Sequence, residues 1–281
     1  MELNRWRKPS TYISYVILTI FALYITFPLF WAFVSSLKTE LQIFRIPLEF
    51  WPKPPTLSNY GNIFNRGNIF QYMSNSAIVA VSTVFIALCI SIPAGYGFAK
   101  FKFPGSSLLL VLFVLLRMIP PIMFNIPYFL MMSNANLLNS YIGLILVHLP
   151  GAVLMGTWLM QGYFRSVPGE IEEAAEIDGL GVIKRLIMIV LPISLPAVTT
   201  VALFNFLGSW NEFMMASTIV RTDQMFTMPV GIRMLSLMQQ QRTFWGIIMA
   251  NAVVYILPVL VVTFLTQKGL IKGITAGAVK A

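Results

Sequence analysis

The chain has 281 residues, of which 57% are hydrophobic and 10% are charged, and its formal net charge is +9. A soluble globular domain carries about 25% charged residues, so this composition excludes that class of protein. The basic residues lie one to three at a time beside apolar segments, which indicates orientation at an anionic membrane and argues against nucleic acid as a partner.

Long uncharged runs predict the membrane-spanning elements. About 20 apolar residues cross the hydrocarbon core as a helix, and in lipid only helices and closed barrels satisfy their backbone groups. The alternating pattern of barrel strands is absent. Divided where residues typical of turns interrupt them, the runs predict an all-α integral membrane protein with six transmembrane helices. These lie at about 12–34, 74–99, 106–132, 140–163, 193–219 and 244–266.

The charges that flank these spans predict their orientation. An even number of spans places both termini on one side, and that side carries eleven Lys and Arg residues against seven on the other. The positive-inside rule then predicts cytoplasmic termini in a multi-pass protein of the plasma membrane. The external loop at 35–73 is rich in proline, which predicts an extended, stiff path.

Five of the ten acidic residues lie together at 170–178, in "EIEEAAEID". A proline near the first helical position and acids in the first turns predict a short helix, which Gly179 ends before a second helical pattern at 182–191. The first helix carries Ile171, Ala174, Ala175 and Asp178 along one side. These residues alone leave two interpretations open, a solvated amphipathic connector or a docking surface for a basic partner.

The spacing within this loop is specific. Glu173-Ala174-Ala175 is followed after three residues by Gly179, after nine more by Ile189, and after one more by Leu191-Pro192. The pattern resembles the cytoplasmic EAA loop of binding-protein-dependent ABC importer permeases, and it lies between the fourth and fifth predicted spans. Other segments are similar to the carbohydrate-type subfamily, which includes the six-span maltose-system permease: "PPTLSNYGNIF" at 54–64, "MSNSAIVAVSTV" at 73–84, "AGYGFAKFKFPG" at 94–105, "RMIPPIMFNIPYFL" at 117–130 and "WNEFMMA" at 210–216.

The resemblance implies a type I ABC importer permease fold in which the loop at about 168–192 is a coupling helix that sits in a cleft on a separate ATPase subunit. The residues it implies for this coupling are Glu173, Ala174, Ala175, Asp178, Gly179, Ile189, Leu191 and Pro192. The ending "KGLIKGITAGAVKA" is similar to a subfamily tail that reaches toward the ATPase pair, with Thr275, Gly277 and Lys280 as contact residues. Its lysines and glycines predict that span six does not continue into it as a buried helix.

The resemblance also implies three segments in the chain and assigns ATP binding to a partner. Residues 1–69 would hold the N-terminal tail, the first span and the external loop, residues 70–266 the permease domain, and residues 267–281 a cytoplasmic tail. The sequence contains no G-x-x-x-x-G-K-[ST] and no Gly-Lys dipeptide, so ATP and Mg²⁺ are expected on a partner ATPase, with no cofactor in this chain.

The expected partners are a second, related permease, two cytoplasmic ATPase subunits, an extracytoplasmic solute-binding protein and membrane lipid, in a bacterial or archaeal inner membrane. No nucleic acid is expected. The implied function is import of a sugar, with di- and oligosaccharides first, by a non-catalytic subunit. A polyol, glycerol phosphate or other small solute is the alternative.

Three ionisable groups lie inside predicted spans, where such groups usually face a cavity or a partner: Arg117, His148 and Glu212. Arg117 either faces a cavity and binds sugar hydroxyls, or binds backbone carbonyls freed by Pro120 and Pro121. His148 has no Cys, Asp or Glu near it in sequence, which favours a hydrogen-bonded packing role over a metal site.

Glu212 follows Trp210 and Asn211, and the three predict either a polar and aromatic wall of the solute pathway or a cap at a span end. Asn125 is a further candidate for the pathway. A rise of about 1.5 Å per residue places Arg117 about 17 Å and Glu212 about 28 Å into their spans, which predicts separate sites.

Two other classes of membrane protein fit less well. An intramembrane enzyme needs an H-E-x-x-H motif, paired aspartates or a Ser–His dyad, whereas this chain has one histidine and no aspartate within a predicted span. An ion-gradient transporter often has inverted repeats and charged relays, and no convincing repeat is present. Neither class explains the EAA spacing.

Overall fold

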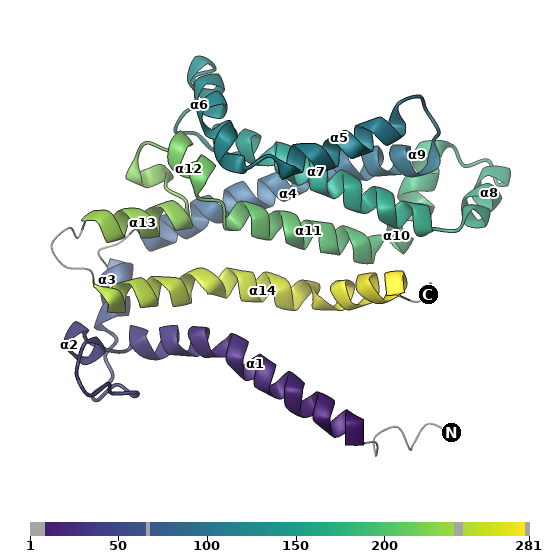
Figure 1. Ribbon diagram of the computed structural model, residues 1–281. Helices are drawn as coiled ribbons and strands as arrows, with labels where there is room; N and C mark the ends of the chain where they lie inside the picture. Colours follow the sequence, from purple (N-terminus) through teal and green to yellow (C-terminus); the bar gives the residue numbers. More distant parts are fainter. Residues whose placement is uncertain (1–8, 66–67, 239–243, 279–281) are drawn as a thin grey trace. The chain divides into compact units, whose positions relative to one another are not determined.

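The computed structural model describes residues 9–65, 68–238 and 244–278 (Figure 1), and within them every regular element is a helix. Among these described residues, four helices are long and apolar enough to cross a membrane, and the crossings rise to six if each of two bent helix pairs counts as one span. The four are α1 (Pro9–Ser36), α4 (Ile69–Lys100), α7 (Tyr141–Ser166) and α14 (Trp245–Ala278). The predicted all-α membrane fold is confirmed.

The third predicted span is bent. Helix α5 (Ser106–Met118) ends before Pro120, and η2 (Pro121–Phe124) and α6 (Asn125–Asn134) follow after a 93° bend. The bend has a local cause, because proline excludes the helical conformation from the residue before it and donates no backbone hydrogen bond. The continuous helix expected over 106–132 is therefore wrong.

The fifth predicted span begins at a bend and is broken near its end. The elements α9 (Val182–Arg185), η3 (Leu186–Val190) and α10 (Leu191–Ile193) meet α11 (Leu195–Trp210) at an 81° bend. The break follows Trp210, before α12 (Met214–Ile219). The helix expected over 193–219 is thus two helices, and Glu212 lies in the break between them.

The chain divides into two compact units, one formed by residues up to 67 with 234–257, and one by 68–233 with residues from 258 onward. The first unit contains α1, α2 (Glu40–Ile43), α3 (Ser58–Asn65) and the first part of α14. The second contains the remaining helices, including α8 (Gly169–Ile177), η4 (Asp223–Met225) and most of α13 (Met228–Met238).

The loop at 35–73 is folded back on itself instead of extended. Buried side chains donate to its backbone carbonyls: Gln42 Nε2 to Lys53 O at 2.7 Å, Lys38 Nζ to Glu49 O at 2.6 Å, and Asn59 Nδ2 to two carbonyls of segment 36–38. Burial lowers the pKa of Lys38, and the charge of Glu49 opposes this shift. These bonds close the loop, so the extended path predicted from its prolines is wrong.

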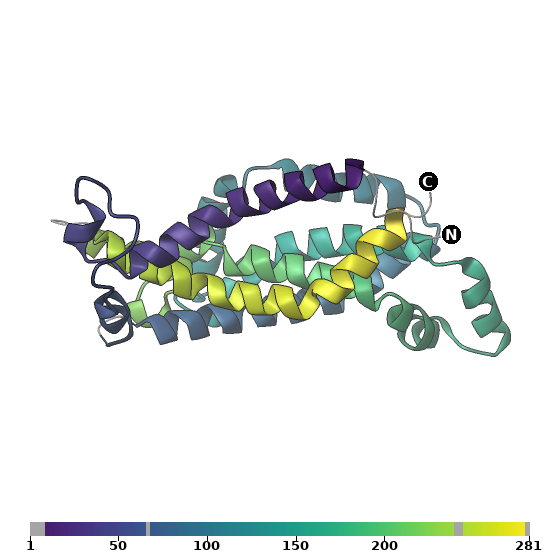
Figure 2. The same cartoon turned by 90° about the horizontal axis from the view of Figure 1, so that it is seen from below.

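The core of the second unit lies between α4, α7 and α11, which run side by side (Figures 1 and 2). Its buried cluster consists of Tyr96, Met160, Phe164, Leu186, Val190, Ala197 and Val201. A Cβ atom added at Gly95 would lie 2.7 Å from Met160 Cβ, and one added at Gly156 would lie 2.7 Å from Ser91 Oγ. Helices α4 and α7 therefore approach closely where these small residues face the other helix.

Helix α4 is bound at its start to the segment that follows α12. Asn75 Nδ2 donates to Gln224 O and Phe226 O, both at 2.8 Å, and Ser76 Oγ accepts from Met228 N at 2.8 Å. This end of α4 thus fixes the position of the segment at 224–228.

Helix α14 continues to Ala278, beyond the end expected at about 266. It includes Thr275 and Gly277, whereas Lys280 lies outside the described residues. The apolar span within this helix is Trp245–Gln267, which confirms the span predicted at about 244–266, and the helix itself continues past it because the lysines and glycines do not stop a helix that is already propagating.

Candidate functional site

The acidic loop forms the corner that its sequence predicts. Helix α8 ends at Ile177, and Gly179 follows with φ +84°, in the left-handed region that glycine adopts at little cost. Gly179 N donates to Glu176 O at 2.9 Å and Leu180 N to Ala175 O at 3.0 Å, which satisfies carbonyls at the helix end. The chain then turns into α9.

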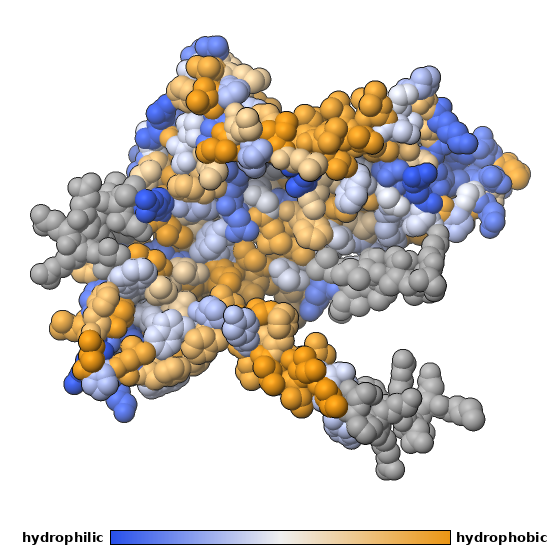
Figure 3. All heavy atoms as spheres, in the orientation of Figure 1, coloured by the Kyte–Doolittle hydropathy of each residue, from blue (hydrophilic) through white to orange (hydrophobic). Residues whose placement is uncertain are grey.

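Most of the predicted coupling residues lie on the surface of this loop. Glu173, Ala174, Asp178, Gly179 and Pro192 are exposed, Ile189 and Leu191 are half-buried, and Ala175 is buried. The side expected to carry Ile171, Ala174, Ala175 and Asp178 is therefore split, because the helix turns Ala175 inward. Helix α8 projects beyond the ends of α4 and α7, and hydrophilic residues gather around it (Figures 1 and 3).

Two isoleucines on this loop were missed by the sequence reasoning. Ile177 is 87% exposed and Ile183 is 72% exposed, on either side of the Gly179 corner. Large apolar side chains exposed in a polar, projecting loop are typical of surfaces that contact another protein or the membrane. Their position beside five acids was the signal that could have identified them.

Two of the five acids have partners within the chain. Glu172 is buried, its Oε2 accepts from Tyr96 Oη at 2.6 Å, and its Oε1 lies 2.7 Å from Lys100 Nζ. Glu176 forms an ion pair with Arg185 of α9. The acids left to face a partner are therefore Glu170, Glu173 and Asp178, which are exposed.

A cavity of about 410 Å³ lies among α4, α7, α11 and the bent α5–α6 pair. Its polar lining includes Thr83, Arg117, His148, Asn205, Ser209 and Glu212, and most of the other lining residues are apolar. A mostly apolar cavity with a few polar groups is typical of a small-molecule site.

The polar wall of this cavity is built around Glu212. His148 Nδ1 lies 2.8 Å from Ser209 Oγ, and His148 Nε2 lies 3.3 Å from Glu212 Oε2. The Glu212 carboxylate also accepts from Met215 N and Ala216 N, both at 2.8 Å, at the start of α12. Glu212 therefore caps a helix, as one of the two interpretations predicted, and it also lines the cavity.

His148 is a buried, hydrogen-bonded histidine, as predicted, but its partners come from α11 and the break after it. They lie far away in sequence, and the signal that could have found them was the presence of one lone acid and one lone histidine within predicted spans. Within residues 9–65, 68–238 and 244–278, no three His, Cys, Asp or Glu side chains gather to hold a metal ion.

Arg117 and Glu212 line the same cavity, so the expectation of separate sites is wrong. The depth estimate assumed a continuous helix through Glu212, whereas α11 ends at Trp210 and Glu212 lies in the break that follows. The exposed side chain of Arg117 is available to a solute or to another subunit.

The other three pathway candidates do not line this cavity. Trp210 is 1% exposed and stacks on Phe206 with ring centroids 5.5 Å apart, because α11 turns it into the core. Asn211 is exposed and donates to Leu207 O at 2.8 Å, and Asn125 begins α6. The aromatic wall expected from Trp210 is therefore absent from the cavity.

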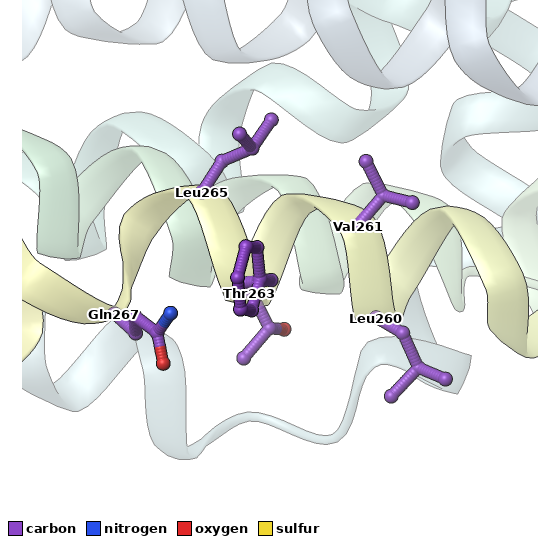
Figure 4. Close-up of a pocket in the computed structure, with 6 residues that line it drawn as sticks. Leu260, Val261, Thr263, Leu265 and Gln267 are labelled. Carbon is purple, nitrogen blue, oxygen red and sulfur yellow. The ribbon is translucent and has the colours of Figure 1, made fainter.

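A second hollow lies on one helix only and is more apolar than the cavity. It is lined by six residues of α14 alone, among them the exposed Leu260, Val261 and Leu265, with Thr263 and Gln267 as its polar members (Figure 4). Val261 and Leu265 point to one side of the helix and Leu260 to the other. A single apolar helix offers no converging polar groups, so this surface suits lipid or another helix.

The family described as "binding-protein-dependent transport system inner membrane component" matches residues 91–275. The chain is 33% identical over 274 residues to the sulfoquinovosyl glycerol transport system permease protein SmoH of Agrobacterium fabrum, covering 97% of this chain and 94% of that protein. It is 34% identical over 273 residues to the galactooligosaccharides transport system permease protein GanQ of Bacillus subtilis, covering 95% and 94%.

Among solved structures, a bacterial ABC transporter involved in the import of the acidic polysaccharide alginate contains a similar chain. The TM-score is 0.75 at 22% identity, over 95% of this chain and 98% of that one. This likeness supports the same fold.

Proposed function

Since the chain belongs to the family of binding-protein-dependent transport system inner membrane components, we propose that it forms part of the path by which an ATP-driven importer moves a sugar across the membrane. The chain is a non-catalytic membrane subunit of an ABC transporter. A di- or oligosaccharide is the favoured solute, because the relatives reported above carry saccharides or sugar glycosides by name.

The observation that carries this proposal is the projecting loop with its Gly179 corner. Its exposed residues include Glu173 and Asp178 together with Ile177 and Ile183, a mixed acidic and apolar surface at a fixed angle. Such a surface fits a cleft on an ATPase subunit that offers basic and apolar groups. We propose that ATP and Mg²⁺ bind to that partner and that its conformational change moves α8.

The cavity supports the solute pathway. Arg117 and Glu212 offer a donor and an acceptor to sugar hydroxyls, and the apolar lining suits the CH faces of a sugar. A cavity of about 410 Å³ fits a small saccharide unit at one time. We expect a second, related permease to complete the path and an extracytoplasmic binding protein to deliver the solute.

In the proposed orientation both termini and the α8 loop lie in the cytoplasm, and the segments at 35–73 and 220–243 lie outside. The excess of Lys and Arg on the first side supports this placement.

Affinity purification of the tagged chain from its native membrane tests the proposal. An ATPase subunit and a second permease should co-purify with it, and added binding protein with its sugar should stimulate ATP hydrolysis by the complex. A chain that purifies alone, or whose partners show no response to any saccharide, would contradict the proposal.

A further inference from the structure

Helix α8 is attached to the rest of the second unit by two ion pairs of different kinds. Glu172 meets Lys100 with side chains that are 10% and 19% exposed, and it also accepts from Tyr96 Oη. Glu176 meets Arg185, with side chains that are 66% and 12% exposed. Water screens a pair whose carboxylate is mostly exposed, whereas removal of one member of a pair in which both side chains are largely buried leaves the other charge without a partner. The first attachment is therefore the stronger one.

The buried attachment holds the loop at two points. Lys100 Nζ lies 2.7 Å from Glu172 Oε1 in α8 and donates to Val167 O at 3.0 Å, just before α8 begins. The Tyr96 ring is buried in the core and packs edge-on against Phe164 of α7, with centroids 5.8 Å apart. The last turn of α4 thus fixes both the carboxylate of α8 and the backbone that leads into it.

The other parts of α4 contact the cavity and the segment at 224–228. This 32-residue helix is about 48 Å long at a rise of about 1.5 Å per residue. Thr83, near its middle, lines the cavity, and Asn75 and Ser76 bind the segment at 224–228 near its start. Since α4 also packs closely on α7, a displacement of its last turn is transmitted through a packed pair and is not absorbed locally.

We propose that Tyr96, Lys100 and Glu172 form an internal anchor that positions the coupling helix α8 on the end of α4 and passes its movement to the cavity wall. The proposal rests on the proposed function of α8 as the ATPase contact. The anchor residues are positioning residues: they contact neither the solute nor the ATPase, and they act through α4.

The test uses the complete importer, with Lys100→Met, Glu172→Gln and the exchanged pair Lys100→Glu with Glu172→Lys. Each single variant should retain its ATPase subunits, because the exposed face of α8 is unchanged, while stimulation of ATP hydrolysis by sugar-loaded binding protein falls roughly tenfold. The exchanged pair restores the opposite charges, and Tyr96 Oη can accept from the new lysine, but the new carboxylate cannot donate to Val167 O, so stimulation should recover in part. Glu176→Gln is the matched control at the pair whose carboxylate is exposed, and it should change stimulation little because water already screens that carboxylate.

Tyr96→Phe keeps the buried ring and removes only the hydroxyl, so it folds and should lose stimulation by about threefold. Hydrogen exchange of the α8 amides in the purified complex gives a second readout that does not depend on transport. Exchange should accelerate in Lys100→Met and Tyr96→Phe and stay unchanged in Glu176→Gln.

The possible results separate the two proposals. Single variants with normal stimulation and unchanged exchange would overturn the anchor, and so would an exchanged pair that stays as defective as the singles. Loss of the ATPase subunits from the singles would also overturn it, because the residues would then be needed only for assembly. A wild-type complex that never responds to sugar contradicts the proposed function, and the exchange measurement still decides whether α8 is held by the anchor.

Discussion

Substitution of Gly179 by valine should uncouple ATP hydrolysis from solute while the protein remains in the membrane. Gly179 has φ +84°, and a Cβ atom built on it meets no heavy atom within 4 Å. A valine there causes no collision, so its whole cost is conformational. An L-residue in the left-handed region costs about 2 kcal/mol, with β-branched residues at the high end.

This cost destabilises the backbone conformation at Gly179, which sets the angle between α8 and α9. A change of about 2 kcal/mol is a factor of about 30 in the population of the native corner. Molecules that leave the native conformation of the corner would lose the two backbone hydrogen bonds that close it, which are donated by Gly179 N and Leu180 N. We therefore expect sugar-dependent stimulation of ATP hydrolysis to fall in the order Gly179→Asn, Gly179→Ala, Gly179→Val, since asparagine tolerates this region best.

Gly181→Val is the matched control. Gly181 has φ −68° and also has open space around an added Cβ, so it accepts the same side chain two residues away without strain. The assay is ATP hydrolysis by the complete importer with and without sugar-loaded binding protein. Equal stimulation in Gly179→Val and wild type, or an equal loss in both valine variants, would refute the reasoning.

Three further substitutions or deletions test other parts of the account. Glu212→Gln removes the charge that faces His148 and should raise the half-saturating sugar concentration in uptake assays severalfold while the complex still assembles; normal uptake would leave Glu212 as a helix cap only. Trp210→Ala empties a buried site and should destabilise the chain by about 3–5 kcal/mol, so thermal unfolding of the purified complex should shift downward; an unchanged unfolding temperature with impaired uptake would instead return Trp210 to the solute path. Deletion of residues 274–281 removes the end of α14 and should leave insertion intact while weakening ATPase retention, and unaltered retention and stimulation would mark the tail as a solvated end.

Local features of the loop were predictable from the sequence. The corner at Gly179 follows from a glycine placed after an acidic, alanine-containing segment, because both the helix and its left-handed end depend on neighbouring residues only. The apolar runs likewise predicted the crossings, since a bilayer imposes a minimum length.

Features that depend on distant residues were not predictable. Glu172 and Glu173 are adjacent and chemically identical, yet only Glu172 is buried, because Tyr96 and Lys100 at the end of α4 happen to face it. The sequence could not indicate which acid turns inward without the position of α4.

The cavity was missed for a related reason. Pro120 and Pro121 predict a break in a helix but do not specify its angle, and residues from both sides of the 93° bend line the cavity that holds Arg117 and Glu212. The pairing of His148 with Glu212 likewise requires α7 and the end of α11 to lie side by side.

The central claim is that this chain moves a sugar under the control of an ATPase coupled through α8. ATP-driven transport in proteoliposomes that hold the complete importer tests it most directly, with ATP on the ATPase side and sugar-loaded binding protein on the other. Labelled oligosaccharide should cross only when ATP is hydrolysed, and Gly179→Val should abolish most of that transport while Gly181→Val preserves it. Transport that follows an ion gradient without ATP, or that proceeds equally in both variants, would contradict the account.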